Sequence, residues 1–434
     1  RSPGLEETDM ARIIIIGGGI GGLSQAYELR EALGKEHQVT LVSDSSRFEF
    51  TPSNPWVAVG WRSAKQITID LPPVLDKHGV EFIPRAAARV HPESNQVELI
   101  DGDKLDYDYL VIATGPQLAF DEIPGLGPDG HTISICKTGH AETASLNFEE
   151  LAKNPGPVVI GAAQGASCYG PAYEYAFIVD TELRKRKIRD QVKMVYVTPE
   201  PYIGHLGLDG VGDTKGLMES ELRQRHISWI TNAKIDEITK GRMQITEVNE
   251  DGADKKQHEL EFKHAMILPA FKGVDAVLGI EGLVNPRGFI NVDEFQRNPA
   301  FPNVYAVGVC VAIPPVAPTP LPVGTPKTGY MIESMVTAGS RNKQAAMQGR
   351  EPDERATWNS LCLAGFRDSG VAFVALPQIP PRNTNWAARG KWVHVAKIGF
   401  EKYFLRKVRN GQTEPAYEKL VLKLMGVNKL KAEA

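Results

Sequence analysis

Four cysteines are spread over this chain of 434 residues, and Cys168 has the setting best suited to chemistry. It ends the segment Gly161-Ala-Ala-Gln-Gly-Ala-Ser-Cys168, a glycine-containing turn that follows an apolar run. We expect a helix to begin near Ser167, which would place Cys168 in its first turn. There the positive end of the helix dipole would lower the pKa of the thiol and favour the thiolate. The commonest alternative for a free cysteine is a small buried hydrophobe, but the position at the end of a strand favours a reactive sulfur.

A second, intact glycine turn opens the chain. Gly17, Gly19 and Gly22 form the pattern G-x-G-x-x-G directly after the apolar run Ile13–Ile16 and before a predicted helix. The first glycine permits the turn, the second lets a pyrophosphate approach the backbone, and the third allows close packing of helix on strand. The helix N-terminus then meets the phosphate charge. The pattern predicts a dinucleotide site, which in a flavoprotein holds FAD, and a simple tight turn is the alternative.

Both turns depart from the usual pattern where a nucleotide would be bound. After the first turn, the next strand ends in Ser43 and Asp44, and either could accept the ribose hydroxyl in place of the usual acid. In the second turn Ala163 replaces the central glycine, which would crowd a pyrophosphate, and the following strand ends in Thr198. A nicotinamide nucleotide is therefore not predicted there, and the thiol of Cys168 suggests sulfur chemistry instead.

Three further segments are predicted to approach the flavin. One buried strand ends in Thr114 and Gly115, and a later strand ends at Gly308. A helix predicted over about 328–348 includes Gly329 near its start and is preceded by Lys327. A helix N-terminus together with a lysine stabilises negative charge on a reduced flavin, although Lys327 could equally be a solvated loop residue.

The elements that must position these residues read as an α/β protein with two Rossmann-like nucleotide-binding domains, because continuous apolar strands alternate with helices. We expect residues 10–120 to form the first part of an FAD-binding domain and 121–290 a second Rossmann-like domain that carries Cys168. Residues 291–355 would return to the first domain, and 356–434 would form a C-terminal region for quinone and membrane contact. Residues 1–9 are expected to be an extension left from expression.

Composition excludes several classes of function. A net charge of −4 gives no reason to expect a nucleic-acid partner. No apolar run is long enough to span a membrane, no secretory signal is visible, and four distant cysteines cannot make a disulfide scaffold. Because closely spaced cysteine or histidine pairs are lacking, no metal site is predicted. His140 and His205 are candidates for proton transfer, with ordinary hydrogen-bonded histidines as the alternative.

The C-terminal segment has a different composition. Between Asn385 and Lys431 there are eleven Lys and Arg but only three Glu, interleaved with six aromatic residues. The stretch Trp392–Val408 places apolar side chains on one helical face with cations around it, the pattern of a helix lying in a membrane interface. A docked amphipathic helix is the alternative.

These motifs together resemble the bacterial sulfide:quinone oxidoreductases, membrane-bound members of the flavoproteins with two dinucleotide-binding domains. The resemblance runs from Met10 to nearly the C-terminus. Besides the first glycine turn, it is carried by Phe50-Thr-Pro-Ser-Asn-Pro-Trp56, Ala113-Thr-Gly115, Gly165-Ala-Ser-Cys-Tyr-Gly-Pro171, Tyr202-Ile-Gly-His205, Pro326-Lys-Thr-Gly-Tyr330 and Trp358–Cys362. It implies FAD as cofactor and a redox pair formed by Cys168 and Cys362.

The resemblance also implies a third site cysteine, Cys136, which in some members is bonded covalently to the flavin. Phe400 and Tyr417 match residues of the family's quinone pocket. One departure is Gly308-Val309, where the family usually has Gly-Asp, so that a ribityl contact is missing. Cys310 matches no catalytic position and is predicted to be a core residue.

The activity so implied is oxidation of hydrosulfide to polysulfide, with two electrons passing through FAD to membrane quinone. The expected location is the surface of the bacterial cytoplasmic membrane, bound peripherally, and a homo-oligomer is one arrangement the resemblance allows. The alternatives are a type II NADH:quinone oxidoreductase, the flavin subunit of a sulfide dehydrogenase, and a flavin-binding membrane adaptor without turnover.

Overall fold

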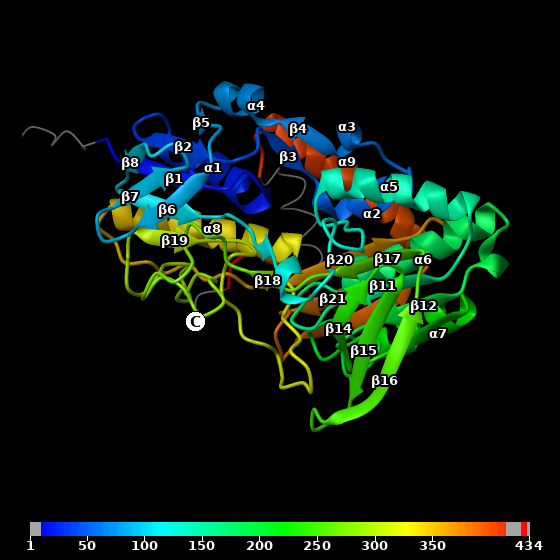
Figure 1. Cartoon of the computed structure of the whole chain (residues 1–434). Coiled ribbons are helices and arrows are strands. Elements are labelled where there is room, and N and C mark those ends of the chain that lie inside the picture. The colour runs from blue at the N-terminus through cyan, green and yellow to red at the C-terminus, as the bar shows by residue number, and fades with distance from the viewer. Residues whose placement is uncertain (1–9, 414–426, 432–434) are drawn as a thin grey trace, which may run out of the picture.

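The computed structural model describes residues 10–413 and 427–431. The N-terminal extension predicted at residues 1–9 lies outside the described residues, as does part of the C-terminal region. Two parallel sheets, each covered by helices, make up the two halves of the molecule (Figure 1). The predicted α/β class with two Rossmann-like domains is confirmed by this arrangement and by the family comparison given below.

The first sheet holds the N-terminal strand at its centre. Its five parallel strands are ordered β19 (Val304–Ala306), β9 (Tyr109–Ile112), β1 (Arg12–Ile16), β2 (Gln38–Val42) and β5 (Glu81–Ile83). The four isoleucines of β1 are all buried, as expected for a parallel strand that is covered on both faces. Helices α1 (Ile20–Leu33) and α8 (Gly329–Met347) pack against each other beside this sheet. The chain therefore returns to its first sheet through β19, after building the second.

The second sheet carries the turn that contains Cys168. Its four parallel strands are β13 (Ile227–Ile230), β12 (Met194–Val197), β11 (Val158–Ala162) and β17 (His264–Leu268). Around it lie α5 (Thr138–Lys153), α6 (Gly170–Lys185) and α7 (Thr214–Gln224). All five residues of β11 are buried, so the loop that follows begins from a rigid strand.

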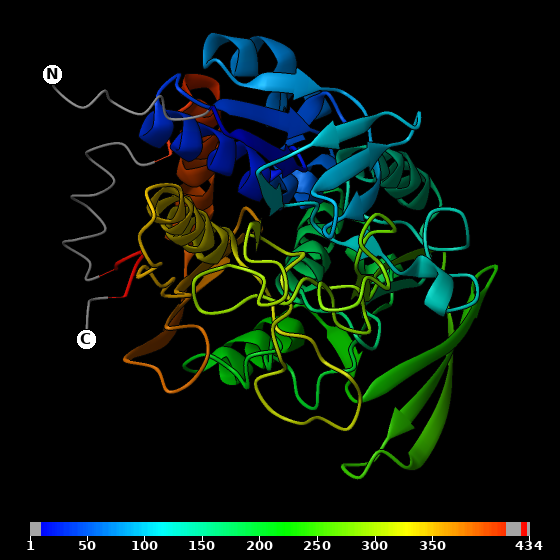
Figure 2. The ribbon, with the colours of Figure 1, turned by 90° about the vertical axis from the view of Figure 1, so that its left-hand side faces the viewer.

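Antiparallel sheets complete the two halves. One consists of β6 (Ala87–His91), β7 (Gln96–Leu99) and β8 (Lys104–Asp106); another, of β14 (Ala233–Thr239), β15 (Arg242–Val248) and β16 (Asp254–Glu261), projects from the body of the molecule (Figure 2). Small pairs are formed by β3 (Arg47–Glu49) with β4 (Thr68–Asp70), and by β10 (Gln117–Leu118) with β18 (Phe271–Lys272). Three short helices are α2 (Asn54–Val57), α3 (Ala64–Ile67) and α4 (Leu71–Lys77).

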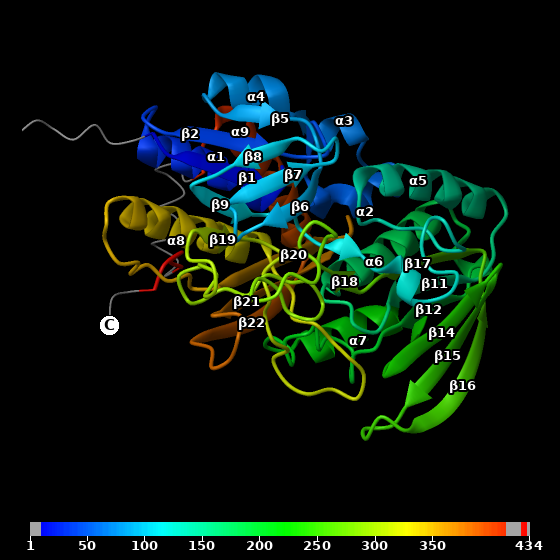
Figure 3. The same cartoon turned by 60° about the vertical axis from the view of Figure 1, so that its left-hand side comes forward.

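The C-terminal region connects the two halves. Its sheet has the order β20 (Ser360–Gly365), β21 (Gly370–Leu376) and β22 (Thr384–Arg389), and it lies between α8 on one side and α6 and α7 on the other (Figure 3). Cys362 stands on β20, which is how a residue late in the chain reaches the second sheet. The segment 427–431 returns to this region through a bridge between Ala356 and Leu430.

Helix α9 (Lys391–Asn410) forms where the sequence predicted an amphipathic helix. It is docked, since Val393, Phe404 and Leu405 are buried, yet it leaves Trp392 50%, Val395 67% and Phe400 40% exposed. One face of the helix is thus packed, as the docked interpretation predicts, and another presents apolar side chains, whose contact with a membrane stays a prediction. Among the described residues, no helix has both the length and the apolar character needed to cross a bilayer.

Lys343 of α8 is completely buried, and it supplies a test of stability. Its ammonium nitrogen donates to the Gly339 carbonyl at 3.2 Å and lies 4.0 Å from the centre of the Tyr305 ring, while burial lowers the pKa of Lys343 to about 7. Because the unfolded chain binds this proton up to a higher pH, the group destabilises the fold most below pH 7, and the penalty fades as pH rises toward 10.5.

We therefore expect Lys343→Met to raise the melting temperature by a few degrees, roughly the effect of 1 kcal/mol or more. The gain should be larger at pH 6 than at pH 9, measured by circular dichroism in the same buffer series. An equal gain at both pH values would show that the charge of Lys343 does not destabilise the fold.

Candidate active site

The first glycine turn has the shape that a dinucleotide requires. Gly17 adopts φ +112°, and a Cβ there would lie 2.2 Å from the Ala113 carbonyl oxygen, while a Cβ on Gly22 would lie 1.8 Å from the Gly17 carbonyl oxygen. These two positions admit only glycine, because the neighbouring atoms are backbone. Gly19 differs: a Cβ there would meet no atom within 4 Å. The turn is thus tight on the protein side and open where a pyrophosphate would approach, so the residues present fit FAD.

The other predicted flavin-binding segments agree with this fit. A Cβ on Gly115, which has φ +67°, or on Gly329, at the start of α8, would also meet no atom within 4 Å. Thr114 precedes Gly115 at the end of β9. Gly308 has φ +88°, so the turn after β19 favours glycine as well. Because no protein atom occupies the space beside Gly115 and Gly329, a bound group could approach the backbone at these two positions.

The ribose candidates separate in the structure. Ser43 is buried, and its Oγ would lie 3.0 Å from a Cβ on Gly18, so it faces the glycine turn. Asp44 is exposed. Contact of either side chain with the ribose remains a prediction.

Lys327 is held where the flavin's electronegative end is expected. Its Nζ donates to the Val309 carbonyl oxygen at 3.0 Å and lies 4.4 Å from the centre of the Phe289 ring. Burial lowers the pKa of Lys327 to about 8. The alternative of a solvated loop lysine is therefore wrong, because this amine is packed against backbone and ring immediately before α8.

Helix α6 begins later than the sequence predicted, and this changes the setting of Cys168. The helix starts at Gly170, so Cys168 lies in the loop before it and not in its first turn. Burial raises the pKa of Cys168 to about 12, with Cys362 and then Cys136 adding to the rise. The predicted lowering of the thiol pKa is wrong, because desolvation opposes the charged form and exceeds the effect of the helix end.

The second turn is hydrogen-bonded to the neighbouring antiparallel sheet. Ala163, which the sequence predicts would crowd a pyrophosphate, is buried. Gln164 makes two hydrogen bonds to Ile235 of β14, donating from Nε2 to the carbonyl oxygen at 2.9 Å and accepting from the backbone N–H at 3.0 Å. Thr198 donates to Glu200. The loop is thus held to the neighbouring sheet, and the lack of a nicotinamide nucleotide at this turn stays a prediction.

Three cysteines from distant parts of the chain converge. A Cβ on Gly170 would lie 4.0 Å from the Cys362 Sγ, which places Cys362 at the first residue of α6 and two residues from Cys168. The mutual effects on the pKa of Cys168 place Cys136 within electrostatic range as well. Burial also raises the pKa of Cys136 and of Cys362, each to about 11. All these thiols are free in this structure.

Cys310 lies apart from this group in its contacts. It is buried, and its Sγ donates to the carbonyl oxygens of Ile112 at 3.2 Å and Val307 at 3.3 Å. It therefore packs in the core of the first sheet, as its apolar surroundings predict.

The two candidate histidines have different surroundings. His140 Nδ1 is 3.1 Å from the Ser134 hydroxyl, which in turn accepts from the Cys136 backbone N–H at 3.1 Å. His205 is buried, and its Nδ1 accepts from the Gly207 N–H at 3.1 Å. Burial lowers the pKa of both rings, so both are neutral at pH 7. The structure brings His140 to the Cys136 loop, whereas His205 lies in the loop between β12 and α7.

A buried ion pair beside Cys362 was missed by sequence reasoning. The Lys397 Nζ lies 2.5 and 2.7 Å from the two carboxylate oxygens of Glu174, which also accepts from the Gly365 N–H at 2.9 Å. Both charges affect the pKa of Cys362. The available signal was Lys397 itself, a lysine within the apolar face of a predicted helix, but its partner on α6 could not be identified without the fold.

The predicted quinone residues are only partly described. Phe400 of α9 packs at 5.9 Å, between ring centres, on Phe50 and on Phe404, and keeps part of its surface exposed. Tyr417 lies outside the described residues.

Fold and glycine turn together define a class: a flavoprotein with two nucleotide-binding-type domains, whose first domain has a turn that fits FAD. The family model of the pyridine nucleotide-disulphide oxidoreductases matches residues 11–338. The match therefore covers over three quarters of the chain.

The closer comparisons narrow the family. The chain is 40% identical to the sulfide-quinone reductase of Aquifex aeolicus over 95% of its own length and 94% of the relative's. The mouse mitochondrial sulfide:quinone oxidoreductase is 23% identical over 70% of this chain and 66% of the relative's length. The X-ray structure of the sulfide:quinone oxidoreductase from Aquifex aeolicus superposes with a TM-score of 0.93 and 40% identity, covering 97% of both chains. This chain belongs to the sulfide:quinone oxidoreductase family.

A structure of NDH2 from Plasmodium falciparum superposes with a TM-score of 0.70 at 16% identity, covering 97% of this chain and 100% of that one. At such low identity the likeness shows a shared fold alone. The type II NADH:quinone oxidoreductase alternative is thus secondary to the family assignment.

Proposed function

We propose that this chain oxidises sulfide to polysulfide, using Cys168 and Cys362 as a redox pair, FAD as the electron carrier and membrane quinone as the acceptor. The observation that carries the proposal is the contact of Cys362 with the start of α6, which brings it to Cys168 from 194 positions away in the chain. Family membership supports the same reaction.

The first chemical step is a thiol exchange on the oxidised pair. Hydrosulfide attacks the Cys168 sulfur, the bond to Cys362 breaks, Cys168 becomes a persulfide, and Cys362 leaves as a thiolate holding the electron pair. Because the two cysteines are bonded to each other in the oxidised pair and carry no free thiol, the entering hydrosulfide is the nucleophile of this step. Repetition would lengthen the sulfur chain until polysulfide leaves.

The FAD would be held by the Gly17–Gly22 turn, by Gly115 and by Gly329, with Lys327 near its electronegative end. When bound, it supplies a two-electron acceptor for the pair left on Cys362 and a donor to quinone. The buried Glu174–Lys397 ion pair and the half-buried positions of the three cysteines limit the access of water to the sulfur intermediates. Cys136 is proposed as a third residue of the site, and protein precipitated in acid would retain yellow flavin if that thiol were bonded to it.

The decisive experiment follows the flavin spectrum of the holoenzyme under anaerobic conditions. Sulfide is expected to bleach the flavin, and decylubiquinone is expected to restore its absorbance. NADH at the same concentration should leave the spectrum unchanged, because Ala163 and Gln164 close the second turn. Bleaching by NADH alone would contradict the proposal and favour the type II NADH:quinone oxidoreductase alternative.

We further propose that the enzyme binds peripherally to the bacterial cytoplasmic membrane through the exposed face of α9. This face bears Trp392 and Val395, spaced by three residues, and continues into the cations Lys402, Arg406 and Arg409. Apolar side chains next to cations suit the interface of an anionic bilayer, from which quinone would enter.

Val395→Glu should weaken sedimentation with phosphatidylglycerol-containing vesicles by roughly tenfold, since burying one such side chain is worth about 1.5 kcal/mol or more. The matched control is Leu146→Glu on α5, where the replaced side chain is 71% exposed against 67% for Val395. Equal loss of binding in the two variants would show that α9 is not the membrane-facing surface.

A further inference from the structure

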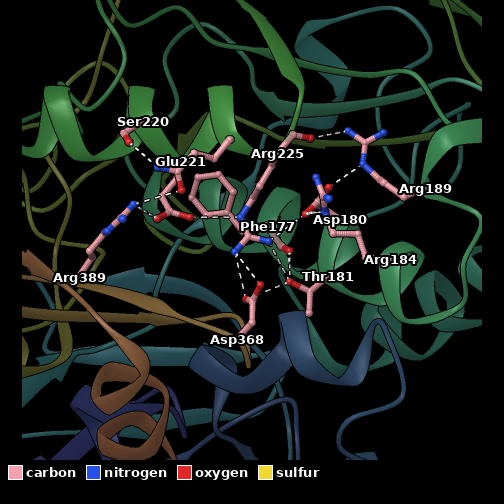
Figure 4. Close-up of polar contacts among 11 residues, drawn as sticks. Phe177, Asp180, Thr181, Arg184, Arg189, Ser220, Glu221, Arg225, Asp368 and Arg389 are labelled. Atoms are coloured by element: carbon pink, nitrogen blue, oxygen red, sulfur yellow. Dashed lines mark hydrogen bonds and ion pairs between the residues drawn. The ribbon is translucent and has the colours of Figure 1, made fainter.

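A network of ion pairs lies at the far end of α6 from the cysteines, centred on Arg225 (Figure 4). The Arg225 guanidinium donates from Nη2 to both carboxylate oxygens of Asp368 at 3.0 and 3.1 Å, and from Nη1 to Asp180 at 2.9 Å and Thr181 at 3.1 Å. Its Nε donates to Glu221 at 3.2 Å. We call these five residues the Arg225 clamp. Its members come from α6, from the end of α7 and from the turn between β20 and β21.

The clamp joins two elements that run side by side from the cysteines. At one end, a Cβ on Gly170 would lie 4.0 Å from the Cys362 Sγ. One turn along α6, Glu174 accepts from the Gly365 N–H at 2.9 Å. Further along α6, the rings of Phe177 and Phe366 pack with their centres 5.0 Å apart. Beyond them, the Thr181 hydroxyl donates to an Asp368 carboxylate oxygen at 3.3 Å. Strand β20 and the turn after it thus follow α6 in register from Gly170 to Thr181, with Cys362 at one end and the clamp at the other.

From this register we infer that Arg225 is a positioning residue for the redox pair: it fixes the β20–β21 hairpin along α6 and thereby holds Cys362 beside Cys168. The inference rests on the proposed function of these two cysteines. Arg225 itself contacts neither thiol, and it acts through the hairpin.

The geometry of a disulfide explains why such a device is needed. Two bridged cysteines have Cβ atoms about 3.5–4.5 Å apart, whereas a slip of one residue moves a strand by about 3.3 Å. A small shift of the hairpin therefore takes the pair out of bonding range. The planar guanidinium resists such a shift, because it holds Asp368 through two hydrogen bonds and lies 4.8 Å from the centre of the Phe366 ring.

The charges around the clamp predict that its variants fold. Without Arg225, Asp180 keeps Arg184 at 2.8 Å and Arg189 at 2.6 Å. Glu221 keeps Arg389 at 2.8 Å, and the side chain of Asp368 is 51% exposed and can be hydrated. No buried carboxylate of the clamp is left without a cation, so loss of Arg225 removes the connection without creating an isolated buried charge.

The test compares Arg225→Gln and Asp368→Asn with Arg184→Gln in the FAD-loaded enzyme. The control removes another cation from Asp180, yet Arg184 has no bond to the hairpin. Two quantities are measured: the rate at which diamide closes the Cys168–Cys362 bridge, followed by free-thiol titration in a background of Cys136→Ser and Cys310→Ala, and the rate of flavin reduction by sulfide with all four cysteines present. Flavin reduction by dithionite and FAD content report on the rest of the site.

We expect the two clamp variants to slow bridge closure and sulfide-driven flavin reduction at least tenfold, with the dithionite rate and FAD content unchanged and the control at the wild-type rate. Arg225→Lys keeps the charge but not the two hydrogen bonds to Asp368. Its rates should therefore lie between those of the wild type and of Arg225→Gln. Wild-type bridging in both clamp variants, or equal slowing in the control, would overturn the inference. If instead Cys362→Ser retained full activity, the proposed function itself would fail, so the two failures are distinguishable.

Discussion

Cys362→Ser and Cys168→Ser are each expected to lower sulfide-dependent quinone reduction by roughly a thousandfold or more, because a hydroxyl forms neither a disulfide nor a persulfide. FAD should remain bound, since neither residue belongs to the glycine turn. The measurement is steady-state reduction of decylubiquinone by sulfide, normalised to the flavin content of each preparation.

The matched control is Cys310→Ala, which removes a thiol that packs in the core of the first sheet against carbonyl oxygens. It should retain activity within about twofold of the wild type. If both serine variants kept the wild-type rate, the chemistry would not pass through this pair, and hydride transfer or direct attack on the flavin would have to replace it.

Gly19→Val is expected to fold normally but to lose FAD. A Cβ at Gly19 meets no protein atom within 4 Å, so the free protein tolerates a side chain there. The same space is where the pyrophosphate must approach the backbone. We expect the variant to purify with less than about a tenth of the wild-type flavin, a loss of at least about 1.4 kcal/mol in binding.

Two companion variants separate binding from folding. Gly22→Val should unfold the turn, because its Cβ would lie 1.8 Å from the Gly17 carbonyl oxygen, so both flavin and melting temperature should fall. Gly399→Ala lies in α9, where a Cβ also meets open space, and should change neither. Flavin is measured by absorbance after denaturation and folding by circular dichroism. A Gly19→Val protein with full flavin content would show that FAD is bound elsewhere.

Several features were determined by the sequence alone, because they depend on local backbone requirements. The turn at Gly17–Gly22 follows from conformational and packing limits that only glycine satisfies, and the four isoleucines before it predict a buried parallel strand. Ala163 led to the prediction that the second turn does not bind a nicotinamide nucleotide, which stays a prediction. Amphipathic spacing likewise predicted the helix observed at Lys391–Asn410.

Resemblance to a family supplied what spacing could not, namely the prediction that Cys362 is the partner of Cys168. No pattern in the 193 intervening positions predicts that contact, since it arises when β20 and the turn after it pack along α6. The same packing pairs Glu174 with Lys397 and Arg225 with Asp368, and each pair joins residues more than a hundred positions apart.

Tertiary structure also decided the electrostatics of the site. The sequence argument placed Cys168 in a first helical turn and predicted a low pKa, but α6 begins at Gly170 and burial raises that pKa instead. Lys327 could be called solvated from its loop position alone, whereas the fold packs it against Val309 and Phe289. Desolvation depends on every element that closes over a group, and those elements come from the whole chain. Local sequence therefore determined which residue types stand at each turn, and only their assembly decided which of them are partners and which carry charge.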